Sequence, residues 1–169
     1  PELIYGPSDQ VGPFATMGII QPLESLFEES FFKQFVKNAV VHYQGHKWMV
    51  GDVVGNHLML IYNKKLLSSP PANTDELIHI GKEFTKDLDG DGKIDQYGLV
   101  WNFTEPFFYA PWLGGFGGWL MTEDNQPDLN TIENQKGFAF IKALRDEYQI
   151  IPKECDYEIA NAMFLNGTA

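Results

Sequence analysis

The stretch from residue 97 to residue 119 holds nine of the chain's 24 aromatic residues, interleaved with glycines and a single carboxylate, Glu105. An aromatic side chain buries roughly 150–250 Å² in an ordinary core, so about half of these nine are expected simply to fill the interior. Flat rings beside amide and carboxylate groups also suit a ligand with CH faces and hydroxyl edges, such as a sugar. Since carboxylates are seldom buried unpaired, Glu105 is predicted either to face solvent or to belong to a site.

The composition is that of a globular chain with an acidic surface. Its 169 residues are 44% hydrophobic and 21% charged, with a formal net charge of −11. Such a surface repels nucleic acid and anionic lipid, which excludes both as partners. The longest uncharged apolar run, 107–121, contains a proline and four glycines and is too short to span a bilayer. The lone Cys155 permits no internal disulfide, and we expect it to be a packed residue rather than a nucleophile.

Hydrophobic periodicity predicts strands alternating with helices. Strands are expected at 3–5, 40–44, 47–50, 57–62 and 97–100. Helices are expected at 10–17, 31–40, 105–113 and 132–148, and two more begin at Asn73 and Asp156, the latter ending at Gly167. This order favours an α/β fold class. Because residue 1 already lies in a strand-like run, no signal peptide is expected, and the start looks cut from a longer chain.

An acidic loop at 87–95 has the spacing of the first part of a calcium-binding loop. Carboxylates occupy positions 1, 3, 5 and 9, Gly92 stands at position 6 and Lys93 at position 7, where the backbone carbonyl is the ligand. The candidate metal ligands are Asp87, Asp89, Asp91, Lys93 and Asp95. Gly98 replaces the glutamate of position 12, so the site would close with water or an acidic residue from elsewhere. We predict structural calcium, since four close aspartates repel one another without a cation. A solvated Asp/Gly-rich turn is the alternative.

Four segments resemble, in order and spacing, the extracellular solute-binding proteins of ABC importers, the family that includes maltodextrin-binding receptors. They are 3–9, 60–71, 101–108 and 156–164. The resemblance covers nearly the whole chain. It implies a periplasmic-binding-protein-like (type II) fold, in which two α/β lobes close on a ligand by hinge motion. Residues 1–56 would be part of the first lobe and 57–169 part of the second.

The resemblance also implies binding residues. Asp9 and Glu105 match acceptors of sugar hydroxyl groups, although Asp9 would serve equally as a helix cap and Glu105 as a favourable helix-terminal charge. Phe107 stands where a tyrosine stacks on sugar, with plain packing as the alternative. The chain departs from the maltodextrin receptors at Gly6, which replaces a stacking tryptophan, and at Gln10 and Asn56, which replace an arginine and a glutamate.

The expected function is therefore non-catalytic binding of a neutral oligosaccharide. Rings of Phe107, with Trp101 or Trp119, would stack on the sugar, and Asp9, Gln10, Asn56 and Glu105 would lie at the site. The resemblance implies a location outside the inner membrane, periplasmic or lipid-anchored, and the importer's permease as the partner. Because members are about twice as long, apolar faces are expected to be uncovered, which favours self-association.

Two other functions stay open from the residues. A glycoside hydrolase would use Asp9 and Glu105 as paired carboxylates roughly 5–10 Å apart. A calcium-dependent interaction module would use the 87–95 loop to organise a docking surface, although such modules carry paired loops with an acidic twelfth residue. Sugar hydrolysis would identify the hydrolase. Loss of ligand binding on chelation would identify the module.

Overall fold

The computed structural model describes residues 2–53, 55, 57–124 and 126–169. The chain divides into two compact units, Pro1–His57 and Leu58–Ala169, and each is described by itself. This division lies beside the lobe boundary expected from the sequence. Asn56, one of the expected binding residues, lies outside the described residues. Among the described helices, none combines the length and apolar character needed to cross a bilayer.

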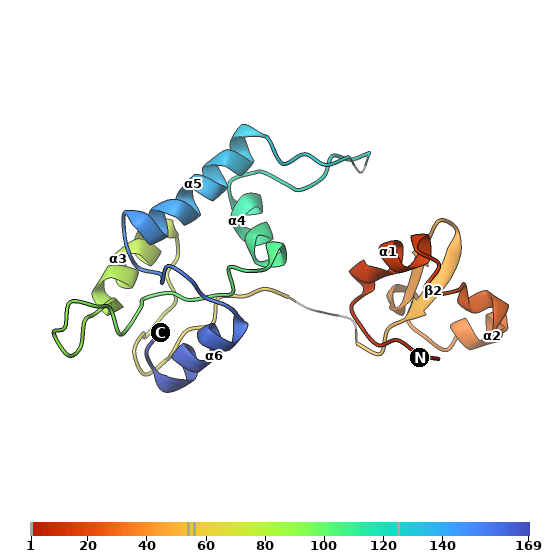
Figure 1. Ribbon diagram of the computed structural model, residues 1–169, viewed down its shortest axis with the longest axis horizontal. Coiled ribbons are helices and arrows are strands. Elements are labelled where there is room, and N and C mark those ends of the chain that lie inside the picture. Colours follow the sequence, from red (N-terminus) through yellow and green to blue (C-terminus); the bar gives the residue numbers. More distant parts are fainter. Residues whose placement is uncertain (1, 54, 56, 125) are drawn as a thin grey trace. The chain divides into compact units, whose positions relative to one another are not determined.

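Unit 1 is built around one β-hairpin (Figure 1). Strand β1 (Val40–Tyr43) pairs antiparallel with β2 (His46–Val50), with Val40 opposite Val50. Gln44 and Gly45 connect them with positive φ angles of 49° and 80°, the turn that matches the twist of a two-stranded ribbon. The hairpin expected from the sequence is thereby confirmed. The helices of unit 1 are short: η1 (Ser8–Gln10), α1 (Val11–Thr16), η2 (Leu23–Ser25), α2 (Glu29–Phe32) and η3 (Lys37–Ala39).

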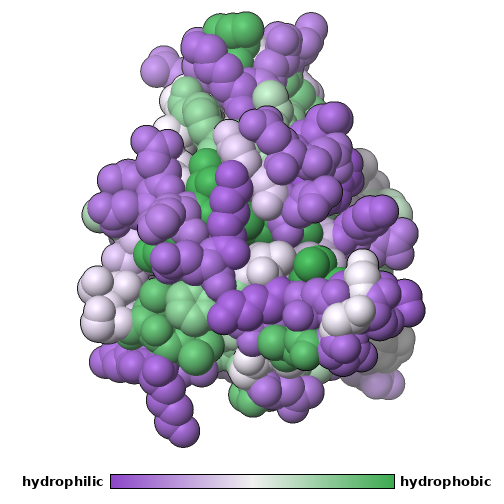
Figure 2. All heavy atoms as spheres, turned by 90° about the vertical axis from the view of Figure 1, so that its left-hand side faces the viewer, coloured by the Kyte–Doolittle hydropathy of each residue, from purple (hydrophilic) through white to green (hydrophobic). Residues whose placement is uncertain are grey.

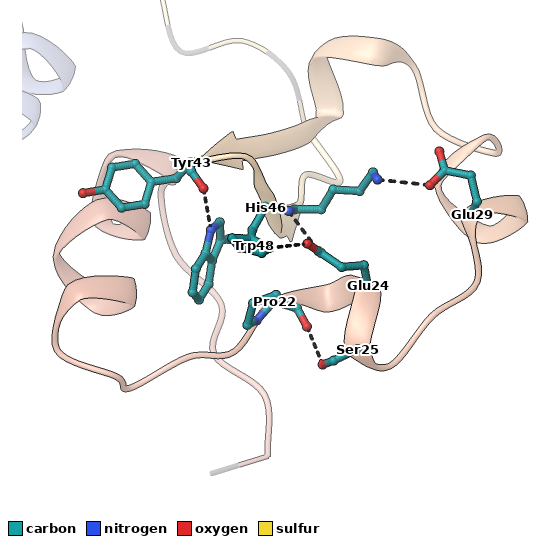
Figure 3. Close-up of polar contacts among 8 residues, drawn as sticks. Pro22, Glu24, Ser25, Glu29, Tyr43, His46 and Trp48 are labelled. Carbon is teal, nitrogen blue, oxygen red and sulfur yellow. Dashed lines mark hydrogen bonds and ion pairs between the residues drawn. The ribbon is translucent and has the colours of Figure 1, made fainter.

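Glu24 fastens η2 to the hairpin (Figure 3). One carboxylate oxygen of Glu24 lies 2.7 Å from Nδ1 of His46, and the other accepts from the backbone N–H of Lys47 at 3.0 Å. The ammonium of Lys47 in turn lies 3.0 Å from the carboxylate of Glu29. The indole N–H of Trp48 donates to the backbone carbonyl of Tyr43. Polar contacts thus connect η2 and α2 to the hairpin.

One predicted strand and one predicted helix of unit 1 do not form as expected. Leu3–Tyr5 is not a strand: no strand among the described residues pairs with it, and Leu3 is 84% exposed. Extended backbone becomes a strand only when a neighbour exchanges hydrogen bonds with it. The helix expected over 31–40 is interrupted, because the backbone at Val36 is extended (φ −63°, ψ 145°). The apolar spacing was helical, but only α2 and η3 form at its ends.

The longer helices of unit 2 each begin after a capping side chain. Helix α3 (Thr74–Phe84) begins after Asn73, whose side chain accepts from the backbone N–H of Glu76. Helix α6 (Tyr157–Asn166) begins after Asp156 and ends at Gly167, which is left-handed with φ 75°. Helix α5 (Ile132–Asp146) begins after Thr131. Between α3 and α5 lie η4 (Pro106–Tyr109) and α4 (Ala110–Gly115), and α4 packs on α5.

Aromatic rings surround the core of unit 2. Leu144, Ile150 and Ile151 are its buried centre. From the 97–119 stretch, the rings of Trp101, Phe103 and Trp112 pack against this centre. The ring of Phe116 packs on Phe140, which in turn packs against the centre. Of the nine aromatic residues, Trp101, Phe103 and Trp112 pack on this core and are only partly buried, which is fewer than the half expected to fill the interior.

The segments 57–62 and 97–100 form no strand, so these two strand predictions are wrong. The segment 97–100 makes isolated backbone hydrogen bonds instead of a strand ladder. The N–H of Tyr97 donates to the carbonyl of Thr168, and the N–H of Leu99 donates to the carbonyl of Ile150. Both segments line an apolar groove of about 520 Å³, together with side chains from α3 and α6. No described strand lies in this groove to pair with them.

Two glycines let α3 approach the 97–100 segment closely. A Cβ atom on Gly98 would lie 2.3 Å from the carbonyl oxygen of Gly81 and 2.4 Å from its Cα. A Cβ on Gly81 would lie 2.6 Å from Cδ1 of Ile150. Only residues without side chains fit at this crossing, which places the end of the acidic loop directly on α3.

The surface of the molecule is largely hydrophilic on the face that Figure 2 shows, with hydrophobic side chains in patches between the polar ones. This agrees with the strongly acidic composition. Several apolar side chains are nonetheless exposed in unit 2, among them Met59, Ile61 and Leu165.

Candidate ligand-binding site

A turn at 102–105 fixes the carboxylate of Glu105. Asn102 follows the extended segment 97–101 and is buried at 3% exposure. Its Oδ1 accepts from the backbone N–H and the hydroxyl of Thr104, at 2.8 and 2.6 Å. Its Nδ2 donates to Oε1 of Glu105 at 2.8 Å. Glu105 itself is exposed, so its carboxylate is held in place and also open to solvent.

Glu105 does not cap the helix that follows it. It precedes η4 with extended backbone, but its side chain makes no capping hydrogen bond and instead points back to Asn102. Pro106 begins η4, where a missing N–H costs little. The helical segment predicted at 105–113 is therefore present as η4 followed by α4.

Phe107 lies at the surface next to Glu105. Its side chain is 44% exposed, and its ring packs edge to face on Phe108 at 5.5 Å between centroids. Tyr109 anchors this turn by donating its hydroxyl hydrogen to the carbonyl of Phe103 at 3.0 Å. The turn therefore presents an acceptor and a partly open ring two residues apart, the combination that a sugar with hydroxyl edges and CH faces requires.

The two tryptophans predicted to stack on a ligand differ in their surroundings. Trp101 packs in the core, with its centroid 4.5 Å from Phe103 and 5.2 Å from Trp112, and its buried indole N–H has no hydrogen-bond partner among the described residues. Trp119 is 59% exposed beside Gly114, and its carbonyl accepts from Asn134 of α5. Trp119 therefore has an open ring, whereas Trp101 is partly buried between other rings and the apolar groove.

In unit 1, Asp9 is exposed within η1, and the side-chain amide of Gln10 donates to its Oδ2 at 3.2 Å. The prediction that Asp9 caps the following helix is wrong. A cap needs non-helical backbone before the first turn, whereas Asp9 lies inside the turn that leads into α1, and no side-chain cap bond is formed there. The adjacent Asp9 and Gln10 are left as an exposed polar pair.

The acidic loop gathers three of the expected metal ligands. Carboxylate oxygens of Asp87, Asp89 and Asp95 lie within 4.8 Å of one another. Asp87 accepts from the backbone N–H groups of Gly92 and Gly90, which hold its pKa below the usual range. Asp91 departs from the expected set, because its carboxylate pairs with the ammonium of Lys93 at 3.0 Å.

The twelfth position of this loop has a structural reason to be glycine. Gly98 lies on the backbone of Gly81, where a Cβ atom does not fit. A glutamate at this position would displace α3. The loop therefore offers a cation the three gathered carboxylates without a bidentate glutamate.

Sequence reasoning missed the role of Asn102. Its signal was present: asparagine side chains commonly accept from the backbone two residues on, which is the Asn102-to-Thr104 contact. The contact with Glu105 three residues on follows from that turn.

Comparison with known proteins supports the resemblance seen in the sequence. The family model described as bacterial extracellular solute-binding protein matches residues 1–169. A maltotriose-binding protein from Pyrococcus abyssi is 26% identical over 172 residues, which cover 100% of this chain and 36% of that protein. The maltose/maltodextrin-binding domain MalE from Bdellovibrio bacteriovorus, solved bound to maltotriose, is 55% identical with a TM-score of 0.93.

The match to the Bdellovibrio structure covers 100% of this chain and 44% of the other. The Thermus thermophilus maltotriose binding protein is 23% identical with a TM-score of 0.70, over 96% of this chain and 43% of that one, and supports the fold alone. The chain thus spans less than half the length of these relatives. These structures confirm the periplasmic-binding-protein-like fold class. The chain belongs to the bacterial extracellular solute-binding protein family.

Proposed function

We propose that this chain is a sugar-binding, non-catalytic receptor component of an ABC importer, with a neutral oligosaccharide of the maltotriose class as its ligand. The observation that carries the proposal is the turn in which the fixed carboxylate of Glu105 stands beside the half-exposed ring of Phe107. The solved relative that is 55% identical over the whole of this chain is described as bound to maltotriose.

The proposed contacts follow from the chemistry of each side chain. Glu105 accepts hydrogen bonds from sugar hydroxyl groups, which ionised carboxylates do well. Phe107 and the open ring of Trp119 stack on CH faces. Unit 1, described by itself, carries a separate exposed polar pair, Asp9 and Gln10. Trp101 takes part by supporting Phe103 and Trp112 from within.

Tryptophan fluorescence tests this proposal. Maltose, maltotriose, trehalose and sucrose are titrated into the chain in calcium-containing buffer, with amino acids as negative controls. A saturable shift with maltotriose or maltose is expected. The shift weakens in Glu105→Gln and persists in Glu147→Gln, the same change at an exposed position on α5's end. A flat response to every sugar contradicts the proposal.

Binding without turnover is the second part of the proposal. Paired-carboxylate hydrolysis needs two carboxyl groups across one bond, whereas the described side-chain partner of the Glu105 carboxylate is the amide of Asn102. Prolonged incubation with maltotriose is expected to release no glucose or maltose. Release of reducing sugar that disappears in Glu105→Gln would establish the hydrolase instead.

We further propose an extracytoplasmic location and the permease of a sugar importer as the protein partner, because the family is described as extracellular solute-binding. The acidic surface favours a basic docking face on that partner. Sugar-dependent stimulation of ATP hydrolysis by a reconstituted maltodextrin importer is the expected readout. Its absence at saturating sugar contradicts the partner.

Structural calcium in the 87–95 loop is proposed from the three gathered carboxylates. Calcium is expected to raise the thermal midpoint, and Asp87→Asn to remove this gain, while Asp124→Asn, outside the loop, retains it. Chelation lowers stability and leaves sugar binding in place at temperatures where the chain stays folded. Loss of sugar binding on chelation would favour the interaction-module function, and an unchanged midpoint would exclude calcium.

Self-association is proposed from the apolar groove and the exposed apolar side chains beside it, Met59 and Ile61. Covering such a patch with a second copy removes apolar surface from water. Light scattering is expected to show a dimer whose population falls in the double substitution Met59→Ser, Ile61→Thr. A monomer at all concentrations contradicts this proposal.

A further inference from the structure

The side chain of Asn102 makes all of its described hydrogen bonds within its own turn. Oδ1 accepts twice from Thr104, and Nδ2 donates to Oε1 of Glu105. Asn102 is 3% exposed, whereas Thr104 and Glu105 are exposed. A buried amide is thus interposed between the backbone of the turn and an exposed carboxylate. Since buried polar groups are costly when unpaired, this arrangement resists rearrangement.

We propose that Asn102 is the positioning residue for the carboxylate of Glu105 in ligand binding. It holds Oε1, so that Oε2 remains available as the acceptor for a sugar hydroxyl. Asn102 itself does not contact the ligand. The inference rests on the proposed function, because it assumes that Glu105 is a binding residue.

The physical reason is the flexibility of a glutamate on the surface. A free glutamate side chain samples several rotamers, and ordering a side chain of this kind on binding weakens the affinity. The bond from Asn102 orders the carboxylate before the ligand arrives. An amide suits this role because its oxygen and nitrogen serve opposite needs at once, accepting from Thr104 and donating to Glu105.

The substitution Asn102→Asp removes the contact with Glu105 and keeps the contact with Thr104. The aspartate still accepts from Thr104, so the turn is retained, but an oxygen replaces the Nδ2 donor and faces Oε1 of Glu105 with like charge. Thr104→Ala is the matched control. It removes the hydroxyl that donates to Asn102 and leaves the Asn102–Glu105 bond. Asn102→Ala removes both contacts and is the second variant.

The first measurement needs no ligand. Three-bond NMR couplings along the Glu105 side chain are expected to show one dominant rotamer in the wild type and in Thr104→Ala. They are expected to show rotamer averaging in Asn102→Asp and Asn102→Ala. Averaging in the wild type overturns the proposal whether or not the chain binds sugar. A single rotamer that persists in Asn102→Asp overturns it as well.

The second measurement is a double-mutant cycle with maltotriose by calorimetry. Asn102→Asp is expected to weaken binding on the order of tenfold, and Thr104→Ala by less than about twofold. In the double variant Asn102→Asp, Glu105→Gln, the amide of residue 105 can donate to the carboxylate of residue 102, which restores the hydrogen bond with its direction reversed. The double variant is therefore expected to bind maltotriose more tightly than the sum of the two single losses in binding free energy predicts. Purely additive losses overturn the positioning role. Wild type that shows one Glu105 rotamer but no affinity for maltotriose refutes the proposed function alone.

Discussion

Replacing Gly98 by alanine tests the close crossing on which unit 2 depends. The new Cβ atom would lie 2.3 Å from the carbonyl oxygen of Gly81, whereas ordinary contact begins at 3.4 Å. The neighbour is helix backbone rather than a flexible side chain tip, so α3 and the 97–100 segment must separate by about 1 Å. Overpacking of this kind costs about 1–3 kcal/mol, occasionally more.

Urea unfolding, followed by tryptophan fluorescence, measures this cost. Three of the four tryptophans, at 101, 112 and 119, belong to unit 2. With a slope of about 1–3 kcal/mol per molar urea, the midpoint is expected to fall by roughly 1 M. Gly115→Ala is the control, since its Cβ meets nothing within 4 Å and it lies in α4, where alanine gains up to about 1 kcal/mol. A Gly98→Ala midpoint equal to that of the wild type would refute the packing argument.

Three further predictions concern single residues of unit 2. Leu144→Ala, at a fully buried position in the core, is expected to lower the unfolding free energy by about 2–5 kcal/mol in the same urea assay, and a change below about 1 kcal/mol would contradict the core assignment. Hydrogen bonds from Arg145 and Lys142 lower the pKa of Asp146 from 3.8 to about 2, so its contribution is complete above pH 4 and is lost as the pH falls through about 2. Asp146→Asn should therefore reduce stability at pH 6 and flatten the loss between pH 4 and 2, and unchanged pH dependence would contradict this. Burial, together with the charge of Asp156, raises the pKa of the Cys155 thiol, so a thiol reagent at pH 7 should react only as the chain unfolds, and rapid native-state labelling would contradict the packed environment.

The helix ends of unit 2 could be predicted from sequence because capping is local. The side chains of Asn73 and Asp156 bond backbone groups three residues away, and Gly167 adopts φ 75° at the end of α6. Local sequence could not show that the segments 3–5, 57–62 and 97–100 form no strands, because a strand depends on a neighbour that local sequence does not specify. The loop spacing predicts a metal ligand where Gly98 stands, and only the position of α3 shows why this residue is glycine.

The candidate site was predictable in part. Glu105 and Phe107 were identified by resemblance, and the structure places both on one exposed turn. Trp101 is predicted from the sequence to stack on the ligand, yet its ring packs on Phe103 and Trp112. The sequence indicates the contact of Asn102 with Thr104, whereas the contact with the Glu105 carboxylate is visible only in the folded turn.

The most direct test of the sugar-binding site is to locate maltotriose by NMR. With the sugar bound to the chain, intermolecular NOEs are expected from sugar CH protons to the ring of Phe107, with upfield ring-current shifts of those protons. Phe138, a ring of equal 44% exposure on α5, is the internal control and should show neither effect. Saturable binding whose NOEs avoid Phe107, or no binding at millimolar maltotriose, would contradict the account.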